Sequence, residues 1–90
     1  MSKISIIIPT INEAHNLPLL FSDLSINQKD GEILVVDGGS EDKTIDIANI
    51  YGAKVYQSKE SNRGLQLNIG AKHSKGEWLI FLHADTRLTY

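Results

Sequence analysis

The chain has 90 residues, of which 41% are hydrophobic and 22% are charged, and its formal net charge is -2. This length allows one small domain, which buries about 60–65% of the surface that its unfolded form exposes. The slight negative charge argues against a nucleic-acid-binding protein, because such proteins usually carry a basic surface. The absence of cysteine excludes disulfides and thiolate sites, and the first apolar run is too short for a signal peptide or a membrane span. We therefore expect a cytoplasmic α/β domain.

Nearly continuous apolar runs, rich in β-branched residues, recur at residues 4–8, 32–37 and 77–85. Such runs predict strands that are buried on both faces of a parallel sheet. The segment 53–58 is weaker and alternates in polarity, which favours an edge strand.

Helical periodicity follows the first run. The i, i+3, i+4, i+7 spacing indicates one buried helical face, which consists of Leu17, Leu20, Phe21 and Leu24. Asn16 suits the N-cap of this helix, and Pro18 is tolerated in its first turn.

A second helix is predicted to begin at Ser40 and to stop at Gly52, a residue type typical of the C′ position. Its expected inward face consists of Ile47, Ile50 and Tyr51.

A third helix is predicted from about Asn62 to Lys75, with Gly76 as its stop. Gly64 and Gly70 lower its intrinsic propensity. A glycine kept inside a helix often permits close packing on a sheet.

The resulting order, β-α-β-α-β-α-β, predicts an α/β fold with a three-layer, doubly wound, mainly parallel sheet, a Rossmann-like half domain. In such sheets ligands bind in the crevice beyond the carboxyl ends of the strands. Polar motifs follow three of the predicted strands: "PTINEAHN", "DGGS" and "HADT". Each motif alone also fits an ordinary turn or a helix cap. Their shared position at one edge of the sheet favours a single polar cleft.

The chemistry of this cleft points to a cation and a phosphate. A cluster of carboxylates repels anions unless a divalent metal reverses the local charge. A Mg²⁺ or Mn²⁺ ion held by Asp85 would connect the protein to phosphate oxygens. The imidazole–carboxylate pair of His83 and Asp85 slightly favours manganese over magnesium. Arg63 offers a second way to offset phosphate charge. Neither a dinucleotide fingerprint nor a P-loop motif is present.

The stretches "ISIIIPTINEAHNL", "EILVVDGGSEDKTIDIA" and "GEWLIFLHADTRL" resemble, in this order and spacing, the amino-terminal half of family 2 glycosyltransferases of the GT-A fold. The resemblance covers essentially the whole chain. It implies a nucleotide-sugar site made of Pro9, Thr10, Asn12, Glu13, Asp37, Gly39, Ser40, Arg63, Gln66, Asn68 and Ala84. Within that site, Asp37 corresponds to a residue that bonds the base, and Arg63 to one that approaches the diphosphate. The resemblance also implies a divalent metal, Mn or Mg, held by Asp85 with His83 at the first position of the Asp-x-Asp motif.

The reaction implied by the resemblance is metal-assisted transfer of a sugar from a UDP- or GDP-sugar to an acceptor hydroxyl, with inversion. The general base of the family lies past the metal motif, and this chain ends at Tyr90. We therefore expect residues 1–90 to be the donor-binding part, without the acceptor half, and to bind nucleotide weakly without transferring sugar. The parent protein is expected in the cytoplasm, with the inner face of the membrane as an alternative.

Two other interpretations stay open. One is a truncated, non-catalytic module that binds nucleotide or a protein partner. The other is a pyrophosphorylase-like enzyme, which is disfavoured because "PTINEAHN" lacks a glycine-rich basic signature. The missing acceptor half is also expected to leave a long apolar edge exposed at the last strand, through which the chain would self-associate.

Overall fold

The computed structural model of the protein describes residues 3–24 and 31–87. Its elements are β1 (Ile4–Thr10), α1 (Leu17–Leu24), β2 (Gly31–Asp37), α2 (Thr44–Ile50), β3 (Lys54–Gln57), α3 (Arg63–His73) and β4 (Trp78–Phe81). This is the alternation of strands and helices predicted from the sequence. Within these two ranges, no helix has the length and the apolar character needed to cross a membrane.

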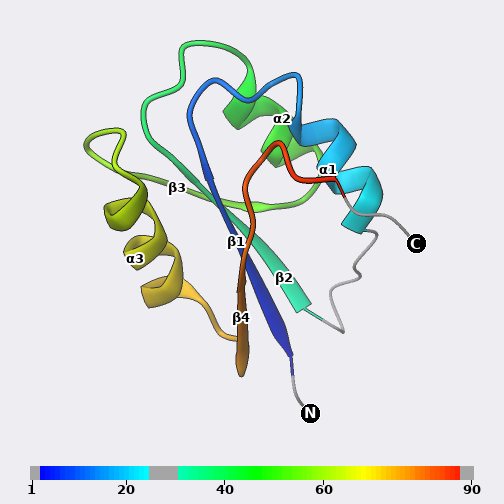
Figure 1. Ribbon diagram of the computed structural model, residues 1–90, viewed down its shortest axis with the longest axis vertical. Coiled ribbons are helices and arrows are strands. Elements are labelled where there is room, and N and C mark those ends of the chain that lie inside the picture. The colour runs from blue at the N-terminus through cyan, green and yellow to red at the C-terminus, as the bar shows by residue number, and fades with distance from the viewer. Residues whose placement is uncertain (1–2, 25–30, 88–90) are drawn as a thin grey trace.

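The four strands form one sheet with the order β3-β2-β1-β4 (Figure 1). Every pairing is parallel, which confirms the predicted fold class. The chain moves from β1 outward to β2 and β3, and then returns to place β4 on the other side of β1. The topological switch point therefore lies between β1 and β4, where ligands of doubly wound sheets bind.

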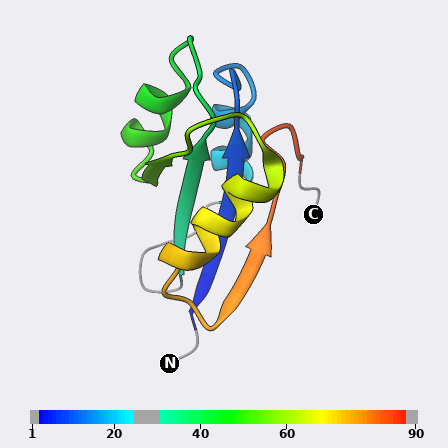
Figure 2. The same cartoon turned by 90° about the vertical axis from the view of Figure 1, so that its left-hand side faces the viewer.

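The sheet is the middle of three layers, with α3 on one face and α1 and α2 on the other (Figure 2). Alternate residues of β1 face opposite layers, because side chains alternate along a strand. Ile6 and Ile8 pack in the core cluster that includes Leu17 and Leu20 of α1. Ile7 packs on the α3 side and is completely buried. Both faces of the central strands are thus covered, as their continuous apolar runs predict.

Gly70 brings α3 close to the sheet. A Cβ atom at this position would lie 2.4 Å from Cγ2 of Ile7 and 3.3 Å from Cγ2 of Val36. A separation of 2.4 Å is far below a carbon–carbon contact distance. The prediction that a glycine inside this helix permits close packing is therefore confirmed.

The predicted start of the second helix at Ser40 is wrong, because α2 begins at Thr44. Side chains satisfy the intervening backbone N–H groups: Asp37 accepts from the N–H of Ser40, and Asn12 Oδ1 accepts from that of Glu41. Asp42 in turn accepts a hydrogen bond from the N–H of Thr44. These contacts hold residues 40–43 in a loop.

The predicted inward face of this helix is also wrong at its end, since Ile50 is 79% exposed and Tyr51 is 50% exposed. The buried residues of α2 are Thr44 and Ala48. A helix turns about 100° per residue, so Ile50 lies almost opposite Ala48. Tyr51 instead stacks on Phe21 of α1, with the ring centroids 5.0 Å apart. Gly52 has φ +83°, which confirms it as the left-handed residue that ends the helix.

The third helix begins as predicted, because the Asn62 side chain caps it by accepting a hydrogen bond from Leu65 N. It ends at His73, two residues earlier than predicted, and Gly76 is not its stop. Gly76 is required by a close approach to β1: a Cβ there would lie 2.6 Å from Ser5 Oγ and 2.8 Å from the Lys3 carbonyl oxygen.

The first helix carries the predicted buried residues Leu17, Leu20 and Phe21, and Leu24 is partly buried. Asn16 directly precedes the helix, and its side-chain amide donates to the Glu13 carboxylate over 2.9 Å.

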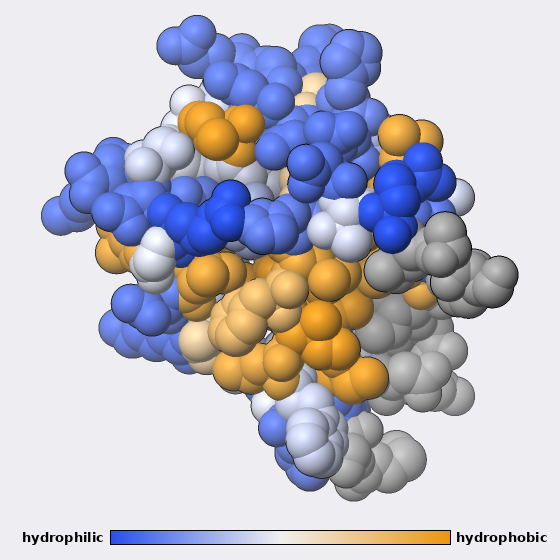
Figure 3. Space-filling model, viewed as in Figure 1, coloured by the Kyte–Doolittle hydropathy of each residue, from blue (hydrophilic) through white to orange (hydrophobic). Residues whose placement is uncertain are grey.

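The prediction that residues 77–85 form a strand buried on both faces is wrong. The strand covers only Trp78–Phe81, and its four side chains are 40–64% exposed. The reason is its place at the edge of the sheet: in the described part of the chain only β1 pairs with it. Apolar surface accordingly gathers over the middle of the molecule, where β4 runs (Figure 3). The prediction that β3 is an edge strand is confirmed.

Candidate donor-binding site

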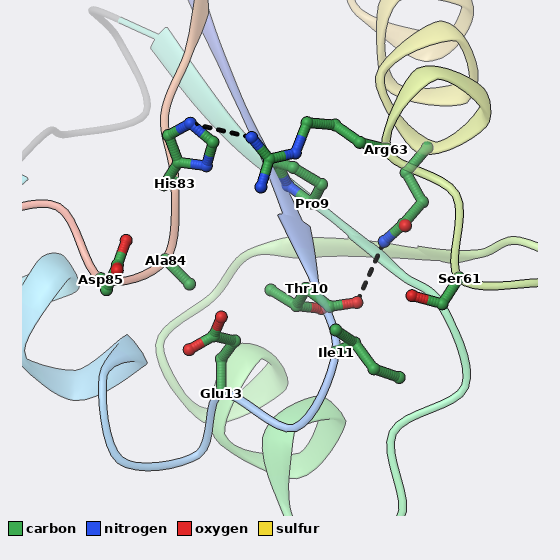
Figure 4. Close-up of a pocket in the computed structure, with 10 residues that line it drawn as sticks. Pro9, Thr10, Ile11, Glu13, Ser61, Arg63, His83, Ala84 and Asp85 are labelled. Atoms are coloured by element: carbon green, nitrogen blue, oxygen red, sulfur yellow. Dashed lines mark hydrogen bonds between the residues drawn. The ribbon is translucent and has the colours of Figure 1, made fainter.

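A pocket of about 220 Å³ lies at the carboxyl ends of β1 and β4, beside the first turn of α3 (Figure 4). Its walls consist of Pro9, Thr10, Ile11, Glu13, Ser61, Arg63, Gln66, His83, Ala84 and Asp85. All the predicted site residues except five are therefore in one place. The five outside the pocket are Asn12, Asp37, Gly39, Ser40 and Asn68.

Asp37 shapes the loop behind the pocket. It is completely buried, and its Oδ1 accepts hydrogen bonds from Thr10 Oγ1 over 2.7 Å and from Ser40 Oγ over 2.5 Å. Its Oδ2 accepts from the N–H groups of Gly39 and Ser40. Burial alone raises the pKa of the Asp37 carboxyl, but the hydrogen bonds from Ser40, Thr10 and Gly39 outweigh it and hold that pKa below its ordinary value. Both oxygens are thus engaged by the protein itself, and contact of Asp37 with a base stays a prediction.

Asn12 ties this loop to the end of β1. It has φ +53°, in the left-handed region that asparagine tolerates better than most residues. Its backbone N–H donates to Ser40 Oγ, and its Oδ1 accepts from Glu41 N, each over 2.8 Å. Gly39 has φ +106°, where a side chain would be strained. Asn12, Gly39 and Ser40 therefore build the wall behind the pocket rather than its lining.

Gln66 clamps α3 onto the ends of the two central strands. Its side chain is almost completely buried, and its Nε2 donates to the carbonyl oxygens of Thr10 over 3.0 Å and Val36 over 2.8 Å. The same packing closes the space around Gly38, where a Cβ would lie 2.9 Å from the Ser61 Cα. A side chain at position 38 would push the loop before α3 away from β2.

The loop after β4 carries the "HAD" residues and is fixed at both ends. Leu82 N donates to the Ile7 carbonyl oxygen over 3.0 Å, and Ala84 is buried in the core under α1. At the far end, Arg87 makes a two-pronged ion pair with Asp23 of α1, in which Nε and Nη2 lie 2.8 and 3.2 Å from the two carboxylate oxygens. With Ala84 turned into the core, His83 and Asp85 are left exposed on either side of it at the pocket.

Arg63 and His83 meet across the pocket. Arg63 Nη1 lies 3.1 Å from His83 Nε2, as the dashed line in Figure 4 marks. The guanidinium is thus the positive side of the pocket, while Glu13 and Asp85 supply two carboxylates on its other side. This division of charge suits a ligand with an anionic part and a bound cation.

The donor set fits a shared cation rather than a closed metal site. Imidazole and carboxylate oxygen are suitable ligands for Mn²⁺, and carboxylate oxygen for Mg²⁺. Among the described residues, however, no three side chains of the His, Cys, Asp and Glu types come together to hold a metal. His83 and Asp85 therefore fit a cation whose other ligands are water and phosphate oxygens.

Sequence reasoning missed Ile11 and Ser61 as lining residues. In the sequence the one local signal for Ile11 is that it is an apolar residue in an otherwise polar loop. In the structure its side chain is 38% exposed. Ser61 reaches the pocket only because α3 packs back over β1 and β2, and the residues around it carry no signal of this.

The fold and the pocket together define a parallel α/β domain with a ligand site at the carboxyl ends of its strands. The model of the glycosyl transferase family 2 matches residues 5–90, and the chain belongs to that family.

The relatives agree with this assignment. A PGL/p-HBAD biosynthesis glycosyltransferase from Mycobacterium bovis (strain BCG / Pasteur 1173P2) is 40% identical over 91 residues, a match that covers 93% of this chain and 36% of that protein. Among solved structures, S. aureus TarS 1–349 in complex with UDP-GlcNAc superposes with a TM-score of 0.79 at 29% identity, over 92% of this chain and 26% of TarS 1–349.

The mannosyltransferase PcManGT from Pyrobaculum calidifontis, in complex with GDP-Man and Mn²⁺, has a TM-score of 0.88 over 98% of this chain and 29% of its own. At 21% identity this likeness concerns the fold alone. The chain thus spans about a third or less of the length of each of these proteins.

Proposed function

We propose that residues 1–90 are the donor-binding part of an inverting glycosyltransferase, which transfers a sugar from a nucleotide diphosphate sugar to an acceptor hydroxyl with the help of a divalent cation. One observation carries the proposal: Arg63, Glu13, His83 and Asp85 line a single pocket at the switch point of the sheet. Membership of the family supports it. So does the 29% identity to S. aureus TarS 1–349, a protein solved with UDP-GlcNAc.

Each part of the pocket has a separate task in this proposal. The nucleoside rests against Pro9, Thr10 and Ile11, on the rigid end of β1 that Gln66 and Asp37 hold in place. Arg63 offsets the negative charge of the diphosphate, for which a planar guanidinium is well suited.

His83 and Asp85 hold the divalent cation in the proposal. When bound, such a cation supplies electrostatic stabilisation of the charge that develops on the departing diphosphate. In this proposal residues 1–90 supply the side chains that bind the donor and the cation.

A panel of nucleotides and nucleotide sugars, each with and without Mn²⁺, tests this function by thermal shift. We expect one nucleotide diphosphate to raise the melting temperature, and the rise to depend on Mn²⁺. Asp85→Asn should abolish the Mn²⁺-dependent part. Asp46→Asn is the matched control, because it removes the same charge from an exposed residue of α2.

The result against the proposal is a panel in which no nucleotide diphosphate stabilises the wild-type chain, with or without Mn²⁺. Stabilisation that Asp85→Asn leaves unchanged would instead favour a nucleotide-binding module that uses no metal at this place.

A further inference from the structure

Arg63 occupies the lone pair of His83 that a metal would use. Its Nη1 lies 3.1 Å from the imidazole Nε2. Arginine has only donors, so Nε2 must be the acceptor in this contact. The neutral imidazole therefore carries its proton on Nδ1. Arg63 thus selects the tautomer of His83 whose free nitrogen faces the pocket.

The guanidinium also lies where a cation is favoured. Its partner His83 shares the pocket with the carboxylates of Asp85 and Glu13, and Figure 4 shows the His83 ring directed at Arg63, with the two carboxylates elsewhere along the same pocket. Arg63 is the only lysine or arginine among the described residues that line the pocket. The positive charge of the protein and that of an incoming metal would therefore compete for one position.

We propose that Arg63 and the divalent cation alternate as the partner of His83 Nε2. The inference rests on the proposed function. In the ligand-free chain Arg63 holds His83 Nε2. When nucleotide diphosphate and cation bind together, Arg63 releases His83 and turns to the phosphate oxygens. A guanidinium can make this change because one of its N–H groups suffices for the imidazole nitrogen, while two can donate together to phosphate oxygens.

The exchange gives Arg63 two opposite effects. It opposes a cation that arrives alone, because the cation must displace the guanidinium from Nε2 without offering it a new partner. It favours a cation that arrives with a diphosphate, because the displaced guanidinium then gains the phosphate oxygens. Binding of the metal and of the nucleotide is therefore coupled through one side chain.

The test compares Arg63→Ala with Lys72→Ala in the 90-residue chain. Lys72 is an exposed residue in the last turn of α3 and lines no part of the pocket, so its removal changes the charge of the same helix equally. Mn²⁺ alone is titrated by electron paramagnetic resonance. The nucleotide diphosphate that stabilises the wild type is then titrated by calorimetry at saturating Mn²⁺.

We expect Arg63→Ala to bind Mn²⁺ alone about twofold to tenfold more tightly than Lys72→Ala, which is the effect of one released hydrogen bond. The same variant should bind the nucleotide diphosphate about tenfold or more weakly in the presence of Mn²⁺, since a charge-assisted contact is lost. Equal or weaker binding of Mn²⁺ alone by Arg63→Ala would overturn the exchange, as would the absence of Mn²⁺ binding in both variants.

A second measurement tests the contact between Arg63 and His83 in the absence of any ligand. Nitrogen-15 NMR at pH 8, with the His83 signals assigned by their loss in His83→Gln, reports which ring nitrogen carries the proton. We expect the proton on Nδ1 in the wild type and a loss of this preference in Arg63→Ala. A wild-type ring protonated on Nε2 would overturn the inference. If no nucleotide diphosphate binds, the proposed function fails, and the Mn²⁺-alone and NMR comparisons still decide the role of Arg63.

Discussion

Thr10 and Asp37 end the parallel β1–β2 ladder directly opposite each other, and Thr10 Oγ1 donates a 2.7 Å hydrogen bond to Asp37 Oδ1. The register of two central strands therefore brings together a buried hydroxyl and a buried carboxylate. Through Ser40 and Gly39 the same carboxylate then sets the path of the loop that leads to α2. The wall behind the pocket is anchored at this one pair.

Replacing Asp37 by Asn should destabilise the domain by about 2–4 kcal/mol, because the amide nitrogen cannot accept the hydrogen bonds that one carboxylate oxygen receives. The free energy of unfolding, measured with urea, checks this value. Asp46→Asn is the control and should change it by less than about 0.5 kcal/mol, as expected for an exposed surface site. A loss at Asp37 no larger than that of the control would show that the buried carboxylate does not hold the loop.

Glu32 should make the stability depend on pH in the acid range. Burial by itself raises its pKa, but hydrogen bonds from Lys54, Lys75 N and Ser5 and the charge of Lys54 lower it from 4.5 to about 2. A carboxyl whose pKa is lowered on folding adds stability above its unfolded pKa and loses it as the pH falls through the folded value. The contribution of Glu32 is therefore full above about pH 5 and is lost between there and about pH 2.

Urea unfolding at several pH values between 6 and 2 measures this dependence. Glu32→Gln should flatten the curve over that window. Glu41→Gln, at an exposed residue of the loop before α2, should leave its shape as in the wild type. Parallel curves for the wild type and Glu32→Gln would contradict the assignment.

Two glycines of α3 should respond to alanine with opposite signs. At Gly70 the new Cβ would meet the buried Ile7 side chain at 2.4 Å, so we expect a loss of about 1–3 kcal/mol from overpacking. At Gly64 the new Cβ would lie 3.5 Å from Asn62 Oδ1, an ordinary contact distance, and would meet no other side chain of the described residues within 4 Å. The better helix propensity of alanine should therefore stabilise the protein there by up to about 1 kcal/mol. Thermal or urea unfolding of both variants is sufficient, and a stabilising Gly70→Ala would show that α3 does not need the close approach.

The ion pair between Arg87 and Asp23 should matter for the position of Asp85 more than for stability. The Arg87 side chain is 56% accessible and that of Asp23 is 12% accessible, and losing the exposed partner of such a pair costs about 1 kcal/mol or less. Arg87→Gln should thus lower the stability only slightly but weaken the Mn²⁺-dependent binding of a nucleotide diphosphate several-fold. The double variant Asp23→Arg/Arg87→Asp, in which the two charges are swapped, should recover part of that binding. If neither change alters the binding, the pair is not what holds the loop after β4.

The open edge of β4 should promote self-association. Its outer side has no strand partner in the described ranges, and Ile80 and Phe81 are 40% and 50% exposed. Unpaired apolar edges favour pairing between chains. We expect the mass from light scattering to rise above that of the monomer at high protein concentration, and Ile80→Lys to reduce this rise. A monomeric mass for the wild type at high concentration would contradict the expectation.

The sequence by itself determined the order of the elements, the parallel sheet and most of the pocket. The apolar runs of β1 and β2, the spacing of Leu17, Leu20 and Phe21, and the Asn62 cap are signals carried within a few residues. Right-handed crossovers then bring the carboxyl ends of the strands to one edge, so Thr10, Glu13, His83 and Asp85 meet without further information.

Only the tertiary structure decided what depends on contacts between distant segments. Ser40 does not start a helix, because hydrogen bonds to the side chains of Asp37 and Asn12, from two other strand ends, hold residues 40 and 41 in a loop. Position 76 requires glycine because a Cβ there would lie too close to Ser5, and not because the preceding helix needs a stop. The four apolar residues of β4 lie exposed, because burial follows the place of a strand in the sheet and not its composition. The contact between Arg63 and His83 arises in the same way, since two segments without any shared local pattern meet where α3 packs beside the end of β4.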